Sequence, residues 1–243
     1  MEIGNDVKEI IDITYDFRRD SNGGDPDQHS ATLRRYHKLL WTKSLPNGAL
    51  FKLDDKVNGV YLYFKYDLYE YFLSSDAITH SYSKWKRMQH IIEKIPKIEV
   101  DKIFDMGCTI GAYIIFPCNK IDNFKTINQE RGVNKYINDR FDLTLECIRL
   151  YYDGCESPLQ KIFDANRNYF SLFKNFKGFC DFFLLQDLVT DDFTKVKFFL
   201  PFNSFVFNPL PSSVDEYLEY RDKTIEFIKN RNNRIQNFSR GMQ

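Results

Sequence analysis

Apolar side chains recur at helical spacing in several parts of the chain, and these stripes predict its helices. The clearest stripe follows Ser30, a residue type that caps helices, and consists of Leu33, Tyr36, His37, Leu40 and Trp41. Four further helices are expected: residues 85–95 before Pro96, a helix from Asp139 to about 152, one from the capping signature at 157–160 to near Gly178, and a long terminal helix that begins at Ser213 with Glu216.

Strands are predicted where apolar residues alternate or form short continuous runs between turn signals. The alternation of Ile11, Ile13, Tyr15 and Phe17 has a period of two and indicates a strand. Other strands are expected over residues 49–53, 60–66, 98–104, 109–116 and 196–200. The segment 109–116 is almost wholly apolar, which predicts a central strand buried on both faces.

The remaining segments carry weaker signals. Residues 21–26, 46–48 and 58–59 are turn signals, and the last of these predicts a hairpin. Residues 74–76 offer helix caps, and residues 119–138 are expected to form a strand and a loop. Residues 179–189 are apolar and fit either a strand or a helix.

This succession of elements lacks the regular spacing of βαβ units. The sequence therefore predicts an α+β fold in a single domain over residues 1–243, with a mixed or antiparallel sheet packed against several helices and a long C-terminal helix. Residues 221–240 contain six Lys or Arg against two Asp or Glu. We expect residues 230–243 to form a frayed basic tail, where cations suit the end of a helix.

Composition narrows the class of protein without naming a reaction. The 243 residues are enough for one large domain or two small ones, and an aromatic content of 16% is typical of a folded core. Lys and Arg number 34, as do Asp and Glu, so no overall field draws the chain to nucleic acid or to an anionic membrane. Binding to RNA would need a local patch.

The cysteines and the hydropathy pattern predict a cytoplasmic, soluble protein. There are five cysteines, an odd number, and no CxxC pair, which favours reduced and mostly buried thiols. The N-terminus has no apolar segment of the signal-peptide type, and no apolar run approaches the roughly 20 residues that span a bilayer. No membrane association is expected.

Standard catalytic and cofactor motifs are missing from the sequence. It contains no GxxxxGK[ST], no GxGxxG after a strand, no HExxH and no GxSxG. The four histidines and the scattered cysteines have no metal-ligand spacing, so neither a metal nor a cofactor is expected.

The stretch from Asp16 to Trp41 has the highest density of chemically useful side chains. Arg18, Arg34 and Arg35 suit the bidentate binding of phosphate or carboxylate, His37 can carry a proton near neutral pH, and Asp20 can orient it. In the alternative interpretation the loop acids pair with these arginines, and His37 is a core histidine bonded to a backbone carbonyl.

A second group of charged residues lies in and before the helix that begins at Asp139. Arg131, Arg140 and Arg149 are candidate anion ligands there, and Glu146 is a second candidate for orienting the proton carrier. Asp142, Glu146 and Arg149 also stand at salt-bridge spacing, so a solvated ion-pair face is the alternative. Trp41, Trp85 and the tyrosines could stack on bases, although aromatic residues at helical spacing more often belong to a core.

Six segments of the sequence resemble a family of uncharacterised bacterial proteins, a domain of unknown function. They are TLRRYHKLLW (32–41), IGAYIIFP (110–117), TINQERG (126–132), DRFDLTLECIR (139–149), DFFLLQDLV (181–189) and EYRDKTIEFIKNRNNRI (219–235). The resemblance implies a bacterial or phage-borne cytoplasmic protein of one domain, and it implies no activity. Where the family has Tyr-Thr before Ile-Gly, this chain has Cys108-Thr109.

Two functional hypotheses follow from these residues. In the first, the domain binds or processes a phosphate-bearing ligand, a nucleotide or an RNA end, through the Arg, His and acid residues named above. In the second, it is a non-enzymatic interaction module, an accessory protein of a bacterial or phage operon that binds a protein partner. A cavity shared by the charged residues would favour the first, and an exposed aromatic patch would favour the second. The sequence does not indicate an oligomeric state.

Overall fold

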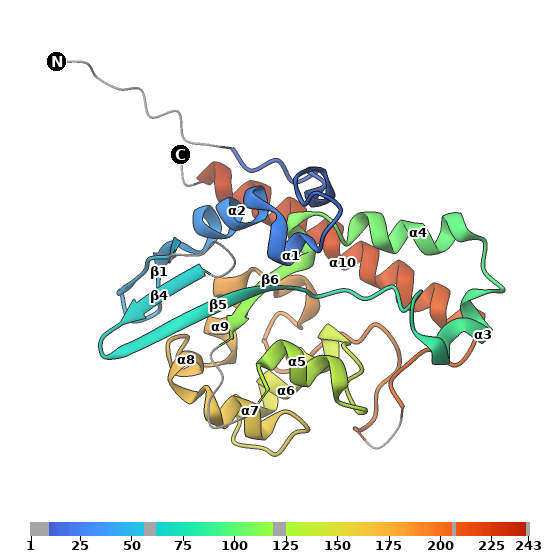
Figure 1. The fold of residues 1–243 in the computed structure, drawn as a ribbon. Helices are drawn as coiled ribbons and strands as arrows, with labels where there is room; N and C mark the ends of the chain where they lie inside the picture. The colour runs from blue at the N-terminus through green and yellow to red at the C-terminus, as the bar shows by residue number, and fades with distance from the viewer. Residues whose placement is uncertain (1–9, 56–61, 119–124, 206–207, 242–243) are drawn as a thin grey trace.

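An antiparallel sheet lies at the centre of the chain in the computed structural model, which describes residues 10–55, 62–118, 125–205 and 208–241 (Figure 1). Its four strands follow the order β3 (Asp54–Asp55), β4 (Leu62–Tyr66), β5 (Tyr69–Ala77) and β6 (Tyr113–Pro117). A separate hairpin joins β1 (Lys43–Ser44) to β2 (Leu50–Phe51). The α+β class with an antiparallel sheet is therefore confirmed.

Helices cover this sheet on two sides. Figure 1 shows α1, α2, α4 and α10 on one side and α5 to α8 on the other. The helical elements are η1 (Phe17–Asp20), α1 (Pro26–His29), α2 (Ala31–Trp41), η2 (Lys86–Met88), α3 (Gln89–Ile92), α4 (Lys97–Met106), η3 (Ile110–Ala112), α5 (Ile127–Val133), α6 (Phe141–Tyr152), α7 (Gln160–Ala165), α8 (Arg167–Ser171), α9 (Phe176–Phe183), η4 (Gln186–Leu188) and α10 (Val214–Gly241). Among the described residues, no helix is long and apolar enough to cross a membrane.

The long hairpin of β4 and β5 follows directly from the alternation of its residues. Leu62 and Phe64 point into the core from β4, and Tyr71 and Leu73 do so from β5. The register pairs Tyr66 with Tyr69, which leaves a two-residue loop, and Asp67 supplies the positive φ of 55° that such a loop needs.

Strand β6 is buried along its whole length although it lies last in the sheet order. This outcome corrects the expected central position, while burial on both faces is confirmed. No further strand pairs with the outer edge of β6, and side chains donate hydrogen bonds to its carbonyls instead. The Tyr169 hydroxyl donates to Ile115 O at 3.2 Å, and Arg231 donates to Tyr113 O at 2.9 Å. A buried edge is stable only when such groups find partners.

The terminal helix α10 packs against η3 and α4 through an unusually close contact. A Cβ atom at Gly111 would lie 2.7 Å from both Asn232 Oδ1 and the Ile228 carbonyl oxygen, so only glycine fits there. Asn232 Oδ1 accepts the Gly111 N–H at 2.7 Å. Because Arg231, Asn232 and Ile235 are buried, the segment that the sequence suggested as a frayed tail packs as regular helix up to Gly241.

Several predicted strands are helices or loops. Residues 98–104 lie in α4, where Val100 and Ile103 pack at helical spacing, and 119–138 contain α5, which begins at a capping box of Thr126 and Gln129. Residues 11–17 form a turn that leads into η1, because the backbone bonds locally from Tyr15 N to Asp12 O. Residues 196–200 contribute only the isolated bridge of Val189 with Val196.

The helical predictions also need three corrections. Residues 74–76 belong to β5 and do not cap a helix. The signature at 157–160 forms no capping box, and the helix expected up to residue 178 is divided into α7, α8 and α9. The last division coincides with Lys174, whose φ of 70° cannot continue a helix. The hairpin predicted at 58–59 lies outside the described residues.

One ion pair of α6 lies entirely within the protein. Arg140 is 2% exposed and Asp142 is 0% exposed, and the Arg140 guanidinium holds the carboxylate through Nε at 3.1 Å and through Nη2. Asp142 also accepts the Phe199 N–H at 2.9 Å, and Arg140 donates to Pro209 O at 2.8 Å. The pair therefore joins α6 to the segment that precedes α10.

We expect Arg140→Met to lower the free energy of unfolding by about 3–5 kcal/mol, because it leaves the Asp142 carboxylate buried without its cation. Urea denaturation followed by circular dichroism measures this loss. The matched control is Lys223→Met, which removes an exposed pair with Glu219 and should cost less than about 0.5 kcal/mol. Equal effects of the two substitutions would contradict a structural role for the buried pair.

Candidate functional site

A cavity of about 700 Å³ opens where the loop before α2 meets the end of β5, the end of α4 and the start of β6. It is lined mainly by polar side chains from three stretches of the chain and by one residue before α6. They include Arg18, Asp25, Asp27, Asp76, Thr79, His80, Lys84, Trp85, Phe104, Cys108, Tyr113 and Asp139. A cavity of this size is in the range of small-molecule sites.

Asp27 brings a carboxyl group into this cavity from the short helix α1. The side chain of Asp25 caps this helix by accepting the Asp27 N–H at 3.1 Å, and α1 packs against β5. Burial raises the pKa of the Asp27 carboxyl group to about 7, although hydrogen bonds from Ser75 and from the Ala77 backbone oppose the rise. Its Oδ1 atom is buried without a hydrogen-bond partner in the described structure. Asp27 is therefore poised to hold or release a proton near neutral pH.

Asp76 and Asp139 complete the acidic wall around a single buried cation. Arg131 is 0% exposed; its Nη1 contacts Asp76, its Nη2 lies 3.3 Å from Asp139, and its Nε donates to Thr144 at 2.9 Å. Burial raises the pKa of Asp76 well above its usual value, and Asp139, Asp27 and Asp25 raise it further, while Arg131 opposes the rise. One guanidinium cannot neutralise three carboxylates, so at least one carboxyl group keeps its proton up to about neutral pH.

The backbone that presents Asp139 is strained. Asn138 and Asp139 both have positive φ angles, 47° and 62°, a conformation that non-glycine residues rarely adopt twice in succession. The Asn138 carbonyl accepts the Tyr82 hydroxyl at 2.9 Å, and its side chain donates to Asn208 at 3.1 Å, so tertiary bonds hold the strained pair. Such strain concentrates at functional sites.

A chain of hydrogen bonds runs from the core to Asp27. Trp41 Nε1 donates to His37 Nδ1 at 3.0 Å, which leaves Nε2 of the neutral ring as the donor to Ser75 Oγ at 2.9 Å. The Ser75 hydroxyl can then donate to Asp27. Burial and the nearby Arg231 lower the pKa of His37 to about 3. His37 is thus a fully buried, neutral histidine that orients Ser75, which in turn supports Asp27.

Aromatic rings form part of the cavity wall. His80 stacks on Tyr82 with ring centroids 4.9 Å apart, and Trp85 meets His80 edge-on at 5.2 Å. Both ring nitrogens of His80 lie near N–H groups, at 2.9 Å from Tyr82 N and 3.2 Å from Trp85 Nε1. Burial lowers the pKa of His80, so the ring acts as a neutral, fixed surface.

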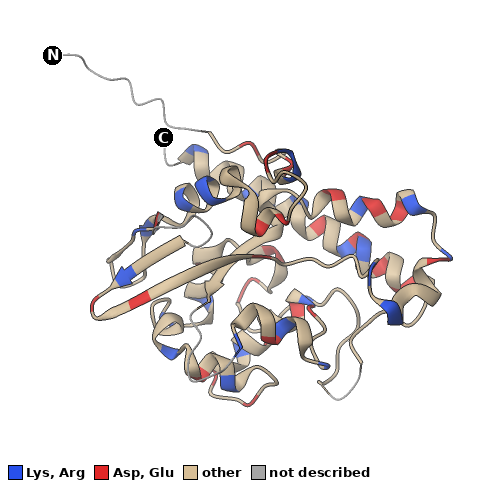
Figure 2. Cartoon of the chain, in the orientation of Figure 1, with Lys and Arg blue, Asp and Glu red and all other residues tan. Residues whose placement is uncertain are grey.

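Two cations also line the cavity, Arg18 and Lys84. Arg18 pairs with Asp16 at 2.6 Å and with Asp105 at 3.0 Å, and its guanidinium lies over the Phe104 ring at 5.1 Å. Lys84 is exposed. Elsewhere Figure 2 shows charges of both signs mixed along the ribbon. Among the residues that the structure describes, no group of three or more His, Cys, Asp or Glu could hold a metal ion.

Comparison with known proteins places the chain in a family. The model of a family of unknown function, DUF6994, matches residues 11–235. The chain belongs to this family. No curated protein and no solved structure matches it. Because the matched range runs from the first described loop almost to the end of α10, it includes the whole cavity.

The site residues expected from the opening stretch of this family member lie in different environments. Arg18 lines the cavity, whereas Asp20 accepts the Ser30 hydroxyl at 2.6 Å and the Thr32 N–H at 2.8 Å and so holds the start of α2. Burial alone would raise the pKa of Asp20, but these bonds lower it. Arg34 donates to Gln28 O at 3.1 Å, and Arg35 lies over the Tyr36 ring at 5.7 Å.

The charged residues expected in and before α6 also lie in different places. Arg131 supports the acidic wall and Arg140 is used by Asp142, as described above. Glu146 and Arg149 pair with each other at 2.7 Å on α6, and Arg149 also pairs with Asp153. Neither Arg34 nor His37 lines the cavity, and the same holds for Glu146 and Arg149. Of the expected arginines, Arg18 lines the cavity and Arg131 is buried behind it, paired with Asp76 and Asp139, while the others lie apart.

Asp27, Asp76, Asp139 and His80 also line the cavity, although the sequence did not single them out as site residues. Asp25-Pro26-Asp27 carried a usable signal, since an Asp followed by Pro is a helix start and places the next acid in the first turn. Asp76 was assigned to a helix cap, and only its position at the end of a strand beside β6 shows that it reaches the cavity.

We expect Asp27→Asn to stabilise the protein at pH 8 and not at pH 4. The folded protein keeps the Asp27 proton up to about pH 7, while the unfolded chain loses it near pH 4, so the carboxyl group destabilises the fold as pH rises between these values. After a discount for partial exposure, the substitution should raise the free energy of unfolding at pH 8 by about 1–2 kcal/mol. This corresponds to a rise in Tm of roughly 2–8 °C.

Thermal melts of wild type and variant between pH 4 and 8 measure this difference. Asp191→Asn at an exposed position is the control and should show no gain that depends on pH. If Asp27→Asn instead lowered Tm by the same amount at every pH, the carboxyl group would be an ionised hydrogen-bond acceptor and the assignment would fail.

Proposed function

We propose that this family member binds a small phosphate-bearing ligand of the nucleotide type in the 700 Å³ cavity, and that Asp27 exchanges a proton with it. The observation that carries the proposal is the joint placement of Asp27 and Asp76 in one cavity, with Asp76 paired to the buried Arg131. A carboxyl group with a pKa near 7 suits general acid–base chemistry, because it can give and take a proton at neutral pH.

The two ends of the cavity suit different parts of such a ligand. The carboxyl groups of Asp27 and Asp76 accept hydrogen bonds from amino or hydroxyl groups, as a base or a ribose offers them. Trp85 and Phe104 provide faces on which a ring can stack. Arg18 and Lys84 also line the cavity and could bind the phosphate of the ligand.

The alternative, a protein-interaction module, finds less support. Within the described ranges the exposed large apolar residues are spread over several elements, among them Leu68 in the β4–β5 turn, Ile98 and Phe104 on α4, and Val133 on α5. Single exposed apolar residues are common on monomers, whereas an interaction surface needs a contiguous patch.

We place this activity in the bacterial cytoplasm as part of the same proposal. The five cysteines are all free, and Cys108, Cys147 and Cys180 are buried. Burial raises the pKa of the Cys108 thiol to about 11, so it lines the cavity as an unreactive thiol. Free thiols of this kind are typical of proteins in a reducing compartment.

The test is a thermal-shift titration with inorganic phosphate, nucleosides and nucleoside monophosphates at pH 6 and pH 8. We expect at least one monophosphate to raise Tm by several degrees at 100-fold excess over its Kd, since such binding adds about 2.7 kcal/mol. Lys84→Ala should weaken the binding of the monophosphate and leave the binding of the corresponding nucleoside unchanged. Asp27→Asn should weaken the binding of both compounds. It should also make the binding at pH 6 equal to the binding at pH 8.

Lys229→Ala, at an exposed position on α10, is the control variant and should respond as wild type does. The proposal fails if no compound of the panel stabilises the protein at millimolar concentration. It also fails if Asp27→Asn binds every compound as tightly as wild type.

A further inference from the structure

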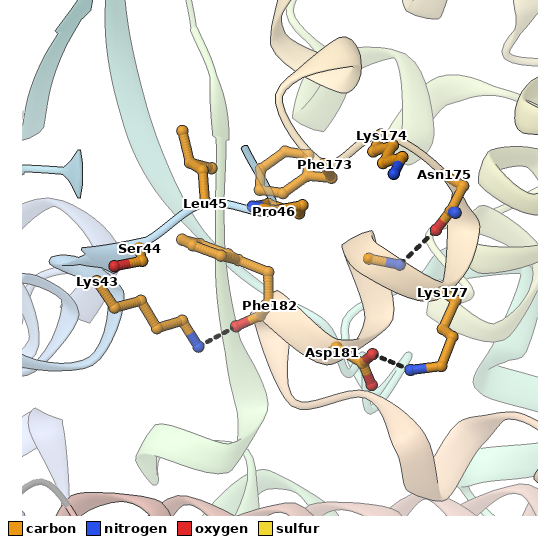
Figure 3. Close-up of a pocket in the computed structure, with 11 residues that line it drawn as sticks. Lys43, Ser44, Leu45, Pro46, Phe173, Lys174, Asn175, Lys177, Asp181 and Phe182 are labelled. Carbon is orange, nitrogen blue, oxygen red and sulfur yellow. Dashed lines mark hydrogen bonds and ion pairs between the residues drawn. The ribbon is translucent and has the colours of Figure 1, made fainter. Parts of the chain in front are cut away.

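A second cavity, of about 400 Å³, lies between the β1–β2 hairpin and the start of α9 (Figure 3). Its polar lining is basic: Lys43 comes from β1, Lys174 and Lys177 come from the α8–α9 turn and from α9, and Asp181 is the carboxylate among the lining residues. Figure 3 shows Lys43 reaching toward the Phe182 carbonyl, while Lys174, Lys177 and Asp181 stand on the other side of the cavity. This cavity shares no lining residue with the one that contains Asp27.

The amine of Lys43 is enclosed by rings. It lies 4.4 Å from the centroid of Phe238, 4.6 Å from that of Phe182 and 5.0 Å from that of Trp41, and it donates to Phe182 O. Trp41 ends α2 and Phe238 belongs to α10, so the enclosure is built by three distant parts of the chain. An amine so placed is held in one position beside the cavity.

No carboxylate within the described residues forms an ion pair with Lys43. Asp181 is used instead by Lys177 and by Gln186 Nε2 at 2.9 Å. The charged groups that act on Lys43 are Arg231 behind it and Asp181 across the cavity. Burial lowers the pKa of the Lys43 ammonium group to about 7, and Arg231 lowers it further while Asp181 opposes this. A large share of the side chain is therefore the neutral, nucleophilic amine near pH 7.

The opposite side of the cavity favours a negative group. Lys174 is exposed and Lys177 is bound to one carboxylate, so the lining has more positive than negative charge. The first turn of α9 also faces this region, with Asn175 accepting the Gly178 N–H at 2.8 Å. A small molecule with an acidic group could be held here while its other end meets Lys43.

We propose that Lys43 is a reactive amine that forms an imine with a small aldehyde or ketone whose acidic group is held by Lys174 and Lys177. The Nζ lone pair attacks the carbonyl carbon, a C–N bond forms, and the carbonyl oxygen takes up the proton that the nitrogen loses. The resulting carbinolamine expels water as the C–O bond breaks and the C=N bond forms. The balance is amine plus carbonyl compound giving imine plus water.

The experiment compares two probes of the same chain length, glyoxylate and acetaldehyde, each added with cyanoborohydride at pH 7. The reductant converts an imine to a stable secondary amine, and peptide mass mapping identifies the labelled lysine. In the wild-type protein we expect Lys43 to be labelled by glyoxylate at least tenfold faster than Lys229, an exposed lysine of α10. This comparison needs no variant and therefore does not depend on how a substitution affects folding.

Two variants separate the amine from the anion site. Lys43→Arg should lose the fast labelling and keep the slow labelling of exposed lysines. Lys174→Ala/Lys177→Ala should slow the labelling of Lys43 by glyoxylate at least threefold and leave its labelling by acetaldehyde unchanged. The proposal is overturned if Lys43 is labelled no faster than Lys229. It is also overturned if the double variant slows both probes equally or neither.

Discussion

The contact of Arg231 with three backbone carbonyls is the interaction on which both cavities depend. The guanidinium is fully buried and donates to Gly111 O at 2.8 Å, to Tyr113 O at 2.9 Å and to Phe183 O at 3.0 Å. It therefore joins α10 to the start of β6 and to the end of α9. A buried cation needs such complete satisfaction, since a guanidinium without acceptors would be costly in the core.

Two of these carbonyls lie at or next to a cavity wall. Tyr113 lines the Asp27 cavity, and Phe182, the neighbour of Phe183, supplies the carbonyl that holds Lys43. Arg231 also lies 5.9 Å from the Trp41 ring and contributes to the low pKa values of His37 and Lys43. Burial is the larger cause of both shifts, and the charge of Arg231 adds to it in each case.

Strand β5 has a comparable role for the acidic cavity, because its last residues face several elements at once. Ser75 receives the bond from His37, Asp76 meets Arg131, and Ala77 pairs with Tyr113 across the register with β6. From the sequence, this segment was read as a source of helix caps, since Ser, Ser and Asp in succession are typical of caps. In the structure, pairing with β6 overrides the preference of these residues for helix caps. The apolar run of β6 predicts a strand, but one sequence does not show which strand pairs with it.

The sequence was a good guide where a pattern was strong and local. The Ser30 cap and the stripe that includes His37 predicted α2, and the terminal capping signal predicted α10. It was a poor guide to the site, since a cavity joins residues such as Asp27 and Asp139 that are over a hundred positions apart. Spacing alone grouped Arg149 with Glu146 correctly as neighbours, yet it could not show that Arg131 would pair with Asp76 of β5.

The fit of Gly111 against Asn232 has a consequence for how the protein is made. Synthesis proceeds from the N-terminus, and domains fold as the required segments leave the ribosome. When β6 and α9 emerge, the carbonyls of Gly111, Tyr113 and Phe183 still lack their partner, because Arg231 is added dozens of residues later. The sheet edge and both cavities can reach their final form only after α10 docks. A chain halted before α10 would therefore leave the carbonyls of Gly111, Tyr113 and Phe183 without the bonds that Arg231 supplies.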